Sequence, residues 1–144
     1  LGTARRSANG WDAGRMNMLL ATMSARLGLP FVDSDIYVNV AGGLKITDPA
    51  MDLAVAAALL SARYQIALPA DLAIFGEVGL SGEVRNSSRA EARIKEASQL
   101  GLNRIICPEF RDQTRASDTA NCNQVRKLSQ LIRVLPDIKE AFAA

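Results

Sequence analysis

The chain has 144 residues, of which 49% are hydrophobic and 22% charged, so it can bury the core of one domain and is not a disordered segment. Its net charge of +2 does not by itself predict a nucleic-acid partner. With no histidine and only two cysteines, the chain cannot form a structural zinc site, a Ser-His-Asp triad or a Cys-His pair.

The two cysteines, Cys107 and Cys122, are too few for a disulfide framework. We therefore expect reduced thiols in a cytoplasmic protein, with Cys107 buried at the end of a strand. The sequence begins at Leu1 without an initiator methionine or a signal-peptide apolar segment, and no apolar run is long enough to cross a bilayer. We expect residues 1–144 to be a single domain cut from a longer protein.

The N-terminal part of the chain predicts a short strand at residues 5–8, a turn at Asn9-Gly10 and then a helix. Asp12 is a typical N-cap, and Gly28 ends the helix after Leu27. Apolar residues recur at helical spacing and are expected to fill the core; they are Met16, Leu19, Leu20, Met23 and Leu27.

Residues 35–40 alternate and are rich in β-branched side chains, which predicts a strand, and residues 44–46 are expected to form another short one. Asp48-Pro49 then predicts the start of a second helix, because Asp48 can accept from free backbone N–H groups and proline there gives up no donor. This helix is apolar nearly all round up to Arg63, so we expect it to be central and buried, with Asp52 near the positive end of its dipole.

Residues 72–75 predict a strand, and the regularly spaced glycines from Gly76 to Gly82 predict two short strands joined by turns. This glycine-rich segment is not a P-loop, because no Gly-Lys-Ser/Thr follows. Ser88 and Glu91 match a capping box, which predicts a helix from there to about Leu100. Its inward residues are expected to be Ala90, Ile94 and Ala97.

The last third of the sequence predicts a buried strand at residues 104–107, a polar loop at 111–123 and a helix over 125–135, followed by one helical turn at 137–142. Trp11 is expected to pack in the core. The order of strands and helices predicts one α/β or α+β domain.

Arginine dominates the basic residues between Arg85 and Arg111, which suits bidentate contact with phosphate. We take Arg85, Arg89 and Arg93 as the main candidates for DNA contact, because the last two are four residues apart on the expected helix. The lesser candidates are Arg5, Arg6 and Lys45. The alternative is that the main three pair with Glu96 or with a neighbouring subunit.

An ordered set of motifs covers most of the chain from Arg5 to Pro108. The motifs are Arg5-Arg6, Gly10-Trp11-Asp12, Ala41-Gly42-Gly43 after the strand at 35–40, Asp48-Pro49-Ala50-Met51-Asp52-Leu53-Ala54, the run from Phe75 to Arg85, Arg93-Ile94-Lys95-Glu96-Ala97 and Leu100-Gly101-Leu102. Together they resemble the C-terminal domain of the bacterial DNA-repair protein RadA, also called Sms.

The resemblance implies a Lon-protease-like fold, also seen in domain 2 of ribosomal protein S5. In that family the whole protein carries a zinc finger and a RecA-type ATPase that drives branch migration, so ATP, Mg and Zn are expected only in those absent domains. This chain would then be a scaffold and DNA contact in a homohexamer. Its expected partners are single-stranded or branched DNA, other copies of itself and the recombinase RecA.

The resemblance also implies that the domain cannot cut peptides. Ala50 stands where the serine of the Lon motif G-P-S-A-G would be, and a methyl group has no lone pair to attack a carbonyl. The lysine that would act as base falls at or near Glu91. Lys95, one turn further on, is expected to be a surface cation beside Glu91 and Glu96.

Two other functions stay open from the sequence. One is a pure oligomerisation module without DNA contact, which sequence does not separate from a DNA-binding scaffold. The other is a serine-lysine peptidase with a displaced pair of catalytic residues. Its nucleophile would come from Ser81, Ser87 or Ser98, and its base from Lys45 or Lys95.

Overall fold

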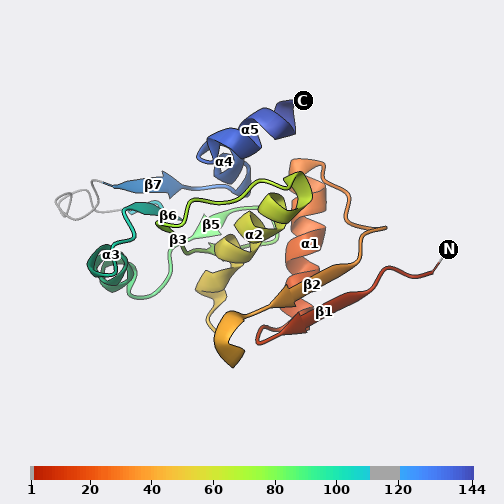
Figure 1. The fold of residues 1–144 in the computed structure, drawn as a ribbon, viewed down its shortest axis with the longest axis horizontal. Coiled ribbons are helices and arrows are strands. Elements are labelled where there is room, and N and C mark those ends of the chain that lie inside the picture. Colours follow the sequence, from red (N-terminus) through yellow and green to blue (C-terminus); the bar gives the residue numbers. More distant parts are fainter. Residues whose placement is uncertain (1, 111–120) are drawn as a thin grey trace.

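The N-terminal third of the molecule is a strand–helix–strand unit (Figure 1). The computed structural model describes residues 2–110 and 121–144. Strand β1 (Arg6–Asn9) pairs in parallel with β2 (Ile36–Asn39), and helix α1 (Ala13–Leu27) connects them. Asp12 caps α1 through its side chain, and Gly28 ends it in the left-handed region at φ 65°. These elements confirm the sequence-based prediction to within a residue or two.

The second helix begins as the sequence predicts. Asp48 accepts from the backbone N–H of Ala50, a 3-10 turn η2 spans Pro49–Met51, and α2 continues as Asp52–Tyr64. Before it, a 3-10 turn η1 spans Ala41–Gly43. The predicted strand at residues 44–46 is wrong, because that segment is irregular and is held to β1 by the bond from Ile46 N to Gly10 O (2.8 Å).

A second, three-stranded parallel sheet has the order β3 (Leu72–Ile74), β6 (Arg104–Pro108), β7 (Cys122–Val125). Between β3 and β6 come a short antiparallel pair, β4 (Glu77–Val78) with β5 (Val84–Arg85), and helix α3 (Ala90–Gln99). The two short strands in the glycine-rich segment are therefore confirmed, and the three residues expected to face inward from α3 are buried.

Strand β7 was not predicted, and the loop expected over 111–123 is wrong for its last residues. Polar Asn123 and Gln124 are exposed on an edge strand, so the period-2 signal is weak there. The rest of that expected loop, residues 111–120, lies outside the described residues.

The C-terminal helices also differ from the prediction. Val125 ends β7, α4 spans only Leu128–Arg133, and Pro136 opens a separate helix α5 (Pro136–Ala143) rather than a single turn. Proline is tolerated at the first helical position, where its missing N–H costs no bond. The apolar stripe from Leu128 to Leu135 is nevertheless buried as expected.

The predicted capping box at Ser88 is wrong. Helix α3 starts at Ala90, and the residue before it, Arg89, sits in the left-handed region at φ 60° and ψ 32° without a side-chain cap. A non-glycine residue in this region is uncommon and costs about 1–2 kcal/mol. Arg89 therefore precedes the helix instead of sharing a helical face with Arg93.

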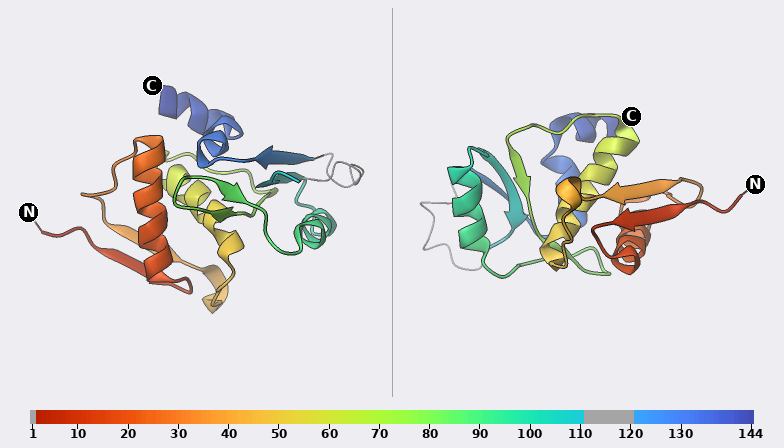
Figure 2. Two further views of the ribbon diagram at one scale, coloured as in Figure 1. Left: turned by 180° about the vertical axis from the view of Figure 1, so that it is seen from behind. Right: turned by 60° about the horizontal axis from the view of Figure 1, so that its bottom comes forward.

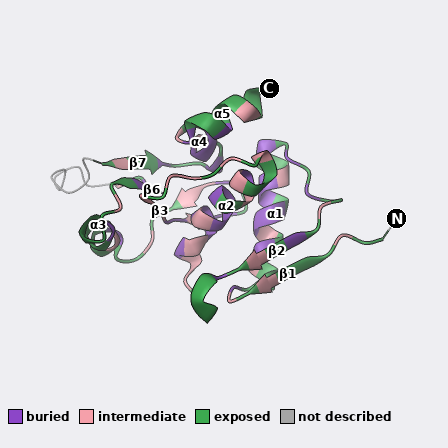
Figure 3. Ribbon diagram, in the orientation of Figure 1, coloured by how far each residue is buried: buried purple, intermediate pink, exposed green. Residues whose placement is uncertain are grey.

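Buried side chains form two cores. The main core joins β1, β2, α1, α2, α4 and α5, and it includes Trp11 at 6% exposure and the stripe of α1 (Figure 3). The smaller core lies between α3 and the second sheet and consists of Ala50, Phe75, Ala90, Ile94, Ala97, Ile105 and Cys107. Figure 2 shows that α3 and the β1–β2 pair lie at opposite ends of the molecule.

Helix α2 lies between these two ends. Ala50 just before it belongs to the smaller core, whereas Leu53 one turn later belongs to the main core. The start of α2 therefore lies where the two cores meet, and the candidate site is located there. In the described ranges, no helix has the length and apolarity needed to span a membrane.

Candidate functional site

Ala50 is fixed and covered. Only 2% of the residue is exposed, and its methyl group packs in the smaller core. Its N–H donates to Asp48 Oδ1 (2.9 Å), and its carbonyl accepts from Gly76 N (2.8 Å). Ala50, which stands at the position of the nucleophile in the Lon motif, therefore makes apolar contacts through its side chain, and its backbone N–H and carbonyl are both hydrogen-bonded.

Arg93 lies over this segment from α3. Its Nη2 donates to Asp48 Oδ2, its Nε donates to the carbonyl of Ser88 (3.1 Å), and its guanidinium lies 5.8 Å from the centre of the Phe75 ring. The pKa of Asp48 is lowered below its ordinary value, mainly by the hydrogen bond from the N–H of Ala50 and to a smaller extent by Arg93. Arg93 pairs with Asp48, which comes from a distant part of the chain, and not with the nearby Glu96.

Asp52 holds a second arginine on the other side of Ala50. Its Oδ1 lies 2.5 Å from Arg15 Nε, and its Oδ2 lies 2.6 Å from Arg15 Nη2 and 3.0 Å from the N–H of Val78. Asp52 is fully buried, whereas the Arg15 side chain keeps 25% exposure. The hydrogen bond to Asp52 raises the pKa of Arg15. This pair ties α1, α2 and β4 together at one carboxylate.

Arg85 is neutralised by two glutamates of the β4–β5 pair. It contacts Glu83 Oε1 through Nε (3.0 Å) and Nη2 (2.5 Å), and lies 3.9 Å from Glu77 Oε1. The Ser81 hydroxyl donates to Glu83. Several interactions, of which this hydrogen bond is the largest, together lower the pKa of the Glu83 carboxyl to about 2. Ser81 is therefore bonded to a carboxylate and not to a lysine.

Arg89 differs from the other two main candidates, because it forms no ion pair with any residue in 2–110 or 121–144. It is exposed and lines an open recess of about 520 Å³ at the start of α3. The same recess is lined by Asn86 and Ser87, and Ser87 Oγ is buried without a hydrogen-bond partner. Of the three arginines, Arg89 is thus the one without an ion pair among the described residues, and the carboxylate of Glu91 lines the same recess.

The lesser candidates lie far from α3. The backbone N–H of Arg5 donates to Asp35 Oδ1 (2.7 Å), and Arg6 Nη2 donates to the carbonyl of Phe31 (3.4 Å). Lys45 is exposed in the irregular segment that follows η1. Arg85, Arg89 and Arg93 belong to β5, the N-cap of α3 and α3, whereas Arg5, Arg6 and Lys45 lie in or next to β1. Since α3 and the β1–β2 pair lie at opposite ends of the molecule (Figure 2), the six candidates do not form one patch.

The other residues considered for catalysis are not arranged as a pair. Glu91, Lys95 and Ser98 are exposed on α3, and within the described ranges neither Lys45 nor Lys95 donates to a serine. Burial raises the pKa of Cys107 to about 12 and also raises that of Cys122, so both are protonated, unreactive thiols. The described residues contain no group of acidic or sulfur ligands suited to a metal ion.

The Arg15–Asp52 pair is the main contact that the sequence reasoning missed. The signal was present, because Asp52 is the only charge in this apolar helix before Arg63, and a buried carboxylate requires a partner. The sequence did not show that Arg15 is this partner. Arg15 is far from Asp52 in the chain, and no pattern in its own helix distinguishes it from the other arginines.

The chain is similar to proteins of two descriptions. A family model described as subunit ChlI of Mg-chelatase matches residues 15–110. The DNA repair protein RadA of Rickettsia typhi is 49% identical over 91% of this chain and 29% of the relative. That of Brucella abortus is 51% identical over 75% of this chain and 23% of the relative, and that of Escherichia coli 39% identical over 93% and 29%. The chain thus spans less than a third of each relative, and the resemblance to RadA is confirmed.

Proposed function

The chain belongs to the family described as subunit ChlI of Mg-chelatase and is homologous to part of RadA, and from this we propose that it is a non-catalytic, DNA-contacting domain acting in DNA repair. We propose that its α/β fold is the one found in Lon proteases and in domain 2 of ribosomal protein S5. The relatives are DNA repair proteins, which supports the repair role, and the mixed α/β topology is compatible with the fold.

The observation that carries the proposal is the buried Ala50. A catalytic nucleophile must reach a substrate, whereas this methyl group is buried in the smaller core. Glu91, at the expected position of the base, is exposed on α3. The position of Ala50 therefore has the surroundings of a structural residue, which supports a domain that binds and positions rather than cuts.

DNA contact in this proposal is electrostatic. Arg89 is the strongest candidate, because it is exposed, has no ion pair among the described residues and stands at the open recess before the N-terminus of α3. Arg85 and Arg93 are weaker candidates than the sequence indicated, since each would have to exchange a carboxylate for a phosphate. Contacts of this kind are salt-sensitive and do not read base sequence.

The wider setting belongs to the whole protein. We propose a homohexamer in the cytoplasm, with a RecA-type ATPase, its ATP and Mg, and a zinc finger in other domains, acting in branch migration beside the recombinase RecA. A second candidate is a pure oligomerisation module. The sequence does not separate it from a DNA-binding scaffold, and Leu44, Leu80 and Leu100, each more than 60% exposed, are apolar side chains that such a module could cover.

Fluorescence anisotropy with labelled duplex and single-stranded DNA over a salt series tests the proposal. We expect Arg89→Ala to weaken binding to both and to reduce the salt slope by about one. Lys139→Ala is the matched control, since Lys139 is an exposed cation on α5 without an ion pair in the described ranges. If the folded chain binds neither DNA at low salt, the DNA role is wrong and the oligomerisation module takes its place.

A further inference from the structure

We propose that the outward face of the β1–β2 pair binds single-stranded nucleic acid, with a base stacked on Tyr37 and a phosphate held by Arg5. This inference rests on the proposed DNA contact and deepens it, because it names the form of DNA and a second place of contact. It concerns the end of the molecule opposite α3 (Figure 2).

The register of the two strands defines this face. Ile36 is buried, and Ala8 and Val38 pack against the main core. The residues between them point the other way, because successive side chains of a strand alternate. The outward pairs are Ser7 with Tyr37 and Asn9 with Asn39, all exposed, and Arg5 continues the same alternation at the start of β1.

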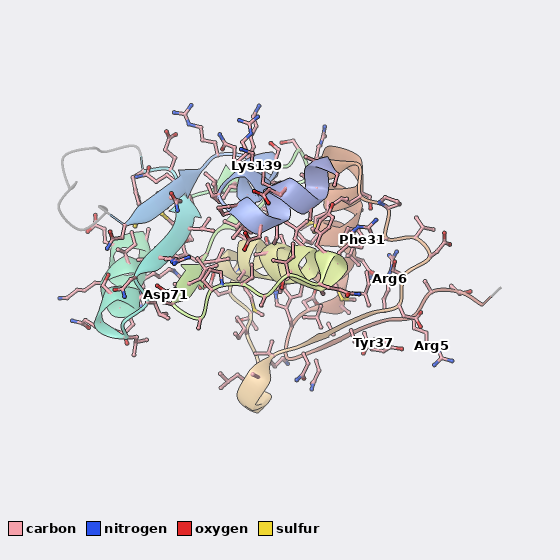
Figure 4. The ribbon with its side chains drawn as sticks, turned by 45° about the horizontal axis from the view of Figure 1, so that its top comes forward. Arg5, Arg6, Phe31, Tyr37, Asp71 and Lys139 are labelled. Atoms are coloured by element: carbon pink, nitrogen blue, oxygen red, sulfur yellow. The ribbon has the colours of Figure 1, made fainter. Side chains whose placement is uncertain are left out.

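Tyr37 is the informative member of the face. Its exposure is 64%, whereas Trp11 and Phe31 are 6% and 4% exposed in the main core. Figure 4 shows Tyr37 and Arg5 projecting from the same side of the strands, away from Arg6 and Phe31. An aromatic ring held open to solvent on a rigid pair of strands, next to a guanidinium, provides the stacking surface and the cation that single strands use.

Polar contacts fix the surroundings of the ring. Asn9 Nδ2 donates to Asn39 Oδ1 (2.9 Å), which leaves amide groups at the far end of the face for a base edge or sugar. The backbone N–H of Arg5 is bonded to Asp35, while its guanidinium has no carboxylate partner in the described ranges. Close packing of Gly10 against Leu44 places the segment with exposed Lys45 at the end of β1, where it adds a second cation.

The residues on the outward face of the β1–β2 pair favour single-stranded nucleic acid as its ligand. The four outward strand residues other than Arg5 are one aromatic, one hydroxyl and two amides, without an aliphatic side chain for the apolar centre of a protein interface. Bases in a duplex are already stacked on each other and offer Tyr37 no free surface. An unpaired strand offers both free bases and phosphates, which match the ring and the cations.

The test compares Tyr37→Ala, Tyr37→Phe and Ser7→Ala in the 144-residue chain, with labelled oligo(dT) and a duplex of equal length as probes. We expect Tyr37→Ala to weaken oligo(dT) binding on the order of tenfold and to leave duplex binding unchanged. Tyr37→Phe keeps the ring and is expected to bind as the parent does. Ser7→Ala removes a neighbouring polar group on the same face and is expected to have little effect.

Two outcomes would overturn the assignment. If Tyr37→Ala leaves oligo(dT) binding intact while Arg89→Ala weakens it, the proposed function stands and this face is not the site. If Tyr37→Ala instead abolishes self-association in sedimentation experiments without changing oligo(dT) binding, the face contacts a second copy of the chain. Because Tyr37 is exposed, unfolding of the variant is not expected, and circular dichroism checks this.

Discussion

Two carboxylates flank Ala50, and each binds an arginine from a different helix, but the two pairs have opposite surroundings. Asp52 is fully buried with Arg15 of α1, whereas Asp48 and Arg93 of α3 keep 44% and 30% side-chain exposure. An arginine–aspartate pair is therefore expected to affect stability differently before and after Ala50. Burial, and not the presence of an ion pair, decides how strongly each side depends on its arginine.

The two carboxylates also differ in their second bond. Asp52 accepts from Val78 N, which attaches β4 to the start of α2. Asp48 accepts from Ala50 N, which is a local helix cap that survives without the arginine. The buried pair thus joins separate parts of the chain, while the exposed pair mainly completes a turn and places Arg93 over the Ala50 segment.

The largest effect is expected on the buried side. Arg15→Met removes the cation and leaves the buried Asp52 carboxylate without the counter-charge of Arg15, so the free energy of unfolding should fall by about 3–5 kcal/mol. Arg93→Met, the matched change on the exposed side, should cost at most about 1 kcal/mol. Urea denaturation of both variants measures the difference.

The charge itself can be separated from the contact on the buried side. In an Arg15→Met background, Asp52→Asn should recover part of the lost stability, since an amide still accepts from Val78 N without a buried charge. Equal losses for Arg15→Met and Arg93→Met would contradict the distinction between the two sides.

A middle-sized effect is expected at Ala50 itself. Ala50→Ser places a hydroxyl among apolar neighbours of the smaller core, so stability should fall by about 1–3 kcal/mol. The variant should cleave no fluorogenic peptide, because Glu91 and not a lysine stands at the expected position of the base. Thermal unfolding and a peptidase assay on parent and variant check both parts; cleavage by either protein would contradict the non-catalytic proposal.

The smallest effect is expected from the charge of Asp48, and it depends on pH. The folded state lowers the pKa of Asp48 below 3.8, chiefly through Ala50 N–H and then Arg93, so the ionised form stabilises the fold. Asp48→Asn keeps the cap but removes the charge. The parent should be more stable by at most about 1 kcal/mol near pH 6, and the difference should decline as the pH falls below 3.8 and vanish below the lowered pKa of the folded state. A difference that does not decline at all as the pH falls would show that charge is not its source.

Sequence patterns correctly predicted those helices and helix ends that are determined by residues close together in the chain. The stripe of α1, its Asp12 and Gly28 ends and the Asp48-Pro49 start of the second helix are each set by a few neighbouring residues, and all are confirmed. The capping box at Ser88 failed although its pattern was complete. The backbone at Arg89 turns into the left-handed region first, so α3 begins too late for Ser88 to cap it.

Features that depend on distant residues were not predictable in this way. Strand β7 is short and polar, and it is a strand because β6 is beside it. Arg93 was expected to bind a phosphate or nearby Glu96, yet its partner Asp48 belongs to another helix start. The same holds for Arg15 and Asp52. One sequence shows which residues carry charge, and only the fold shows which of those charges are already balanced.

The parallel strand pairs set how this chain can reach its fold. β1 pairs with β2 only after α1 has crossed between them, and β3 pairs with β6 only after the β4–β5 pair and α3 have been passed. Neither pairing can start from a tight turn, so each requires the closure of a long loop before it gains any stability. Chain connectivity therefore favours slow folding, with unpaired strand edges exposed to other chains while it proceeds.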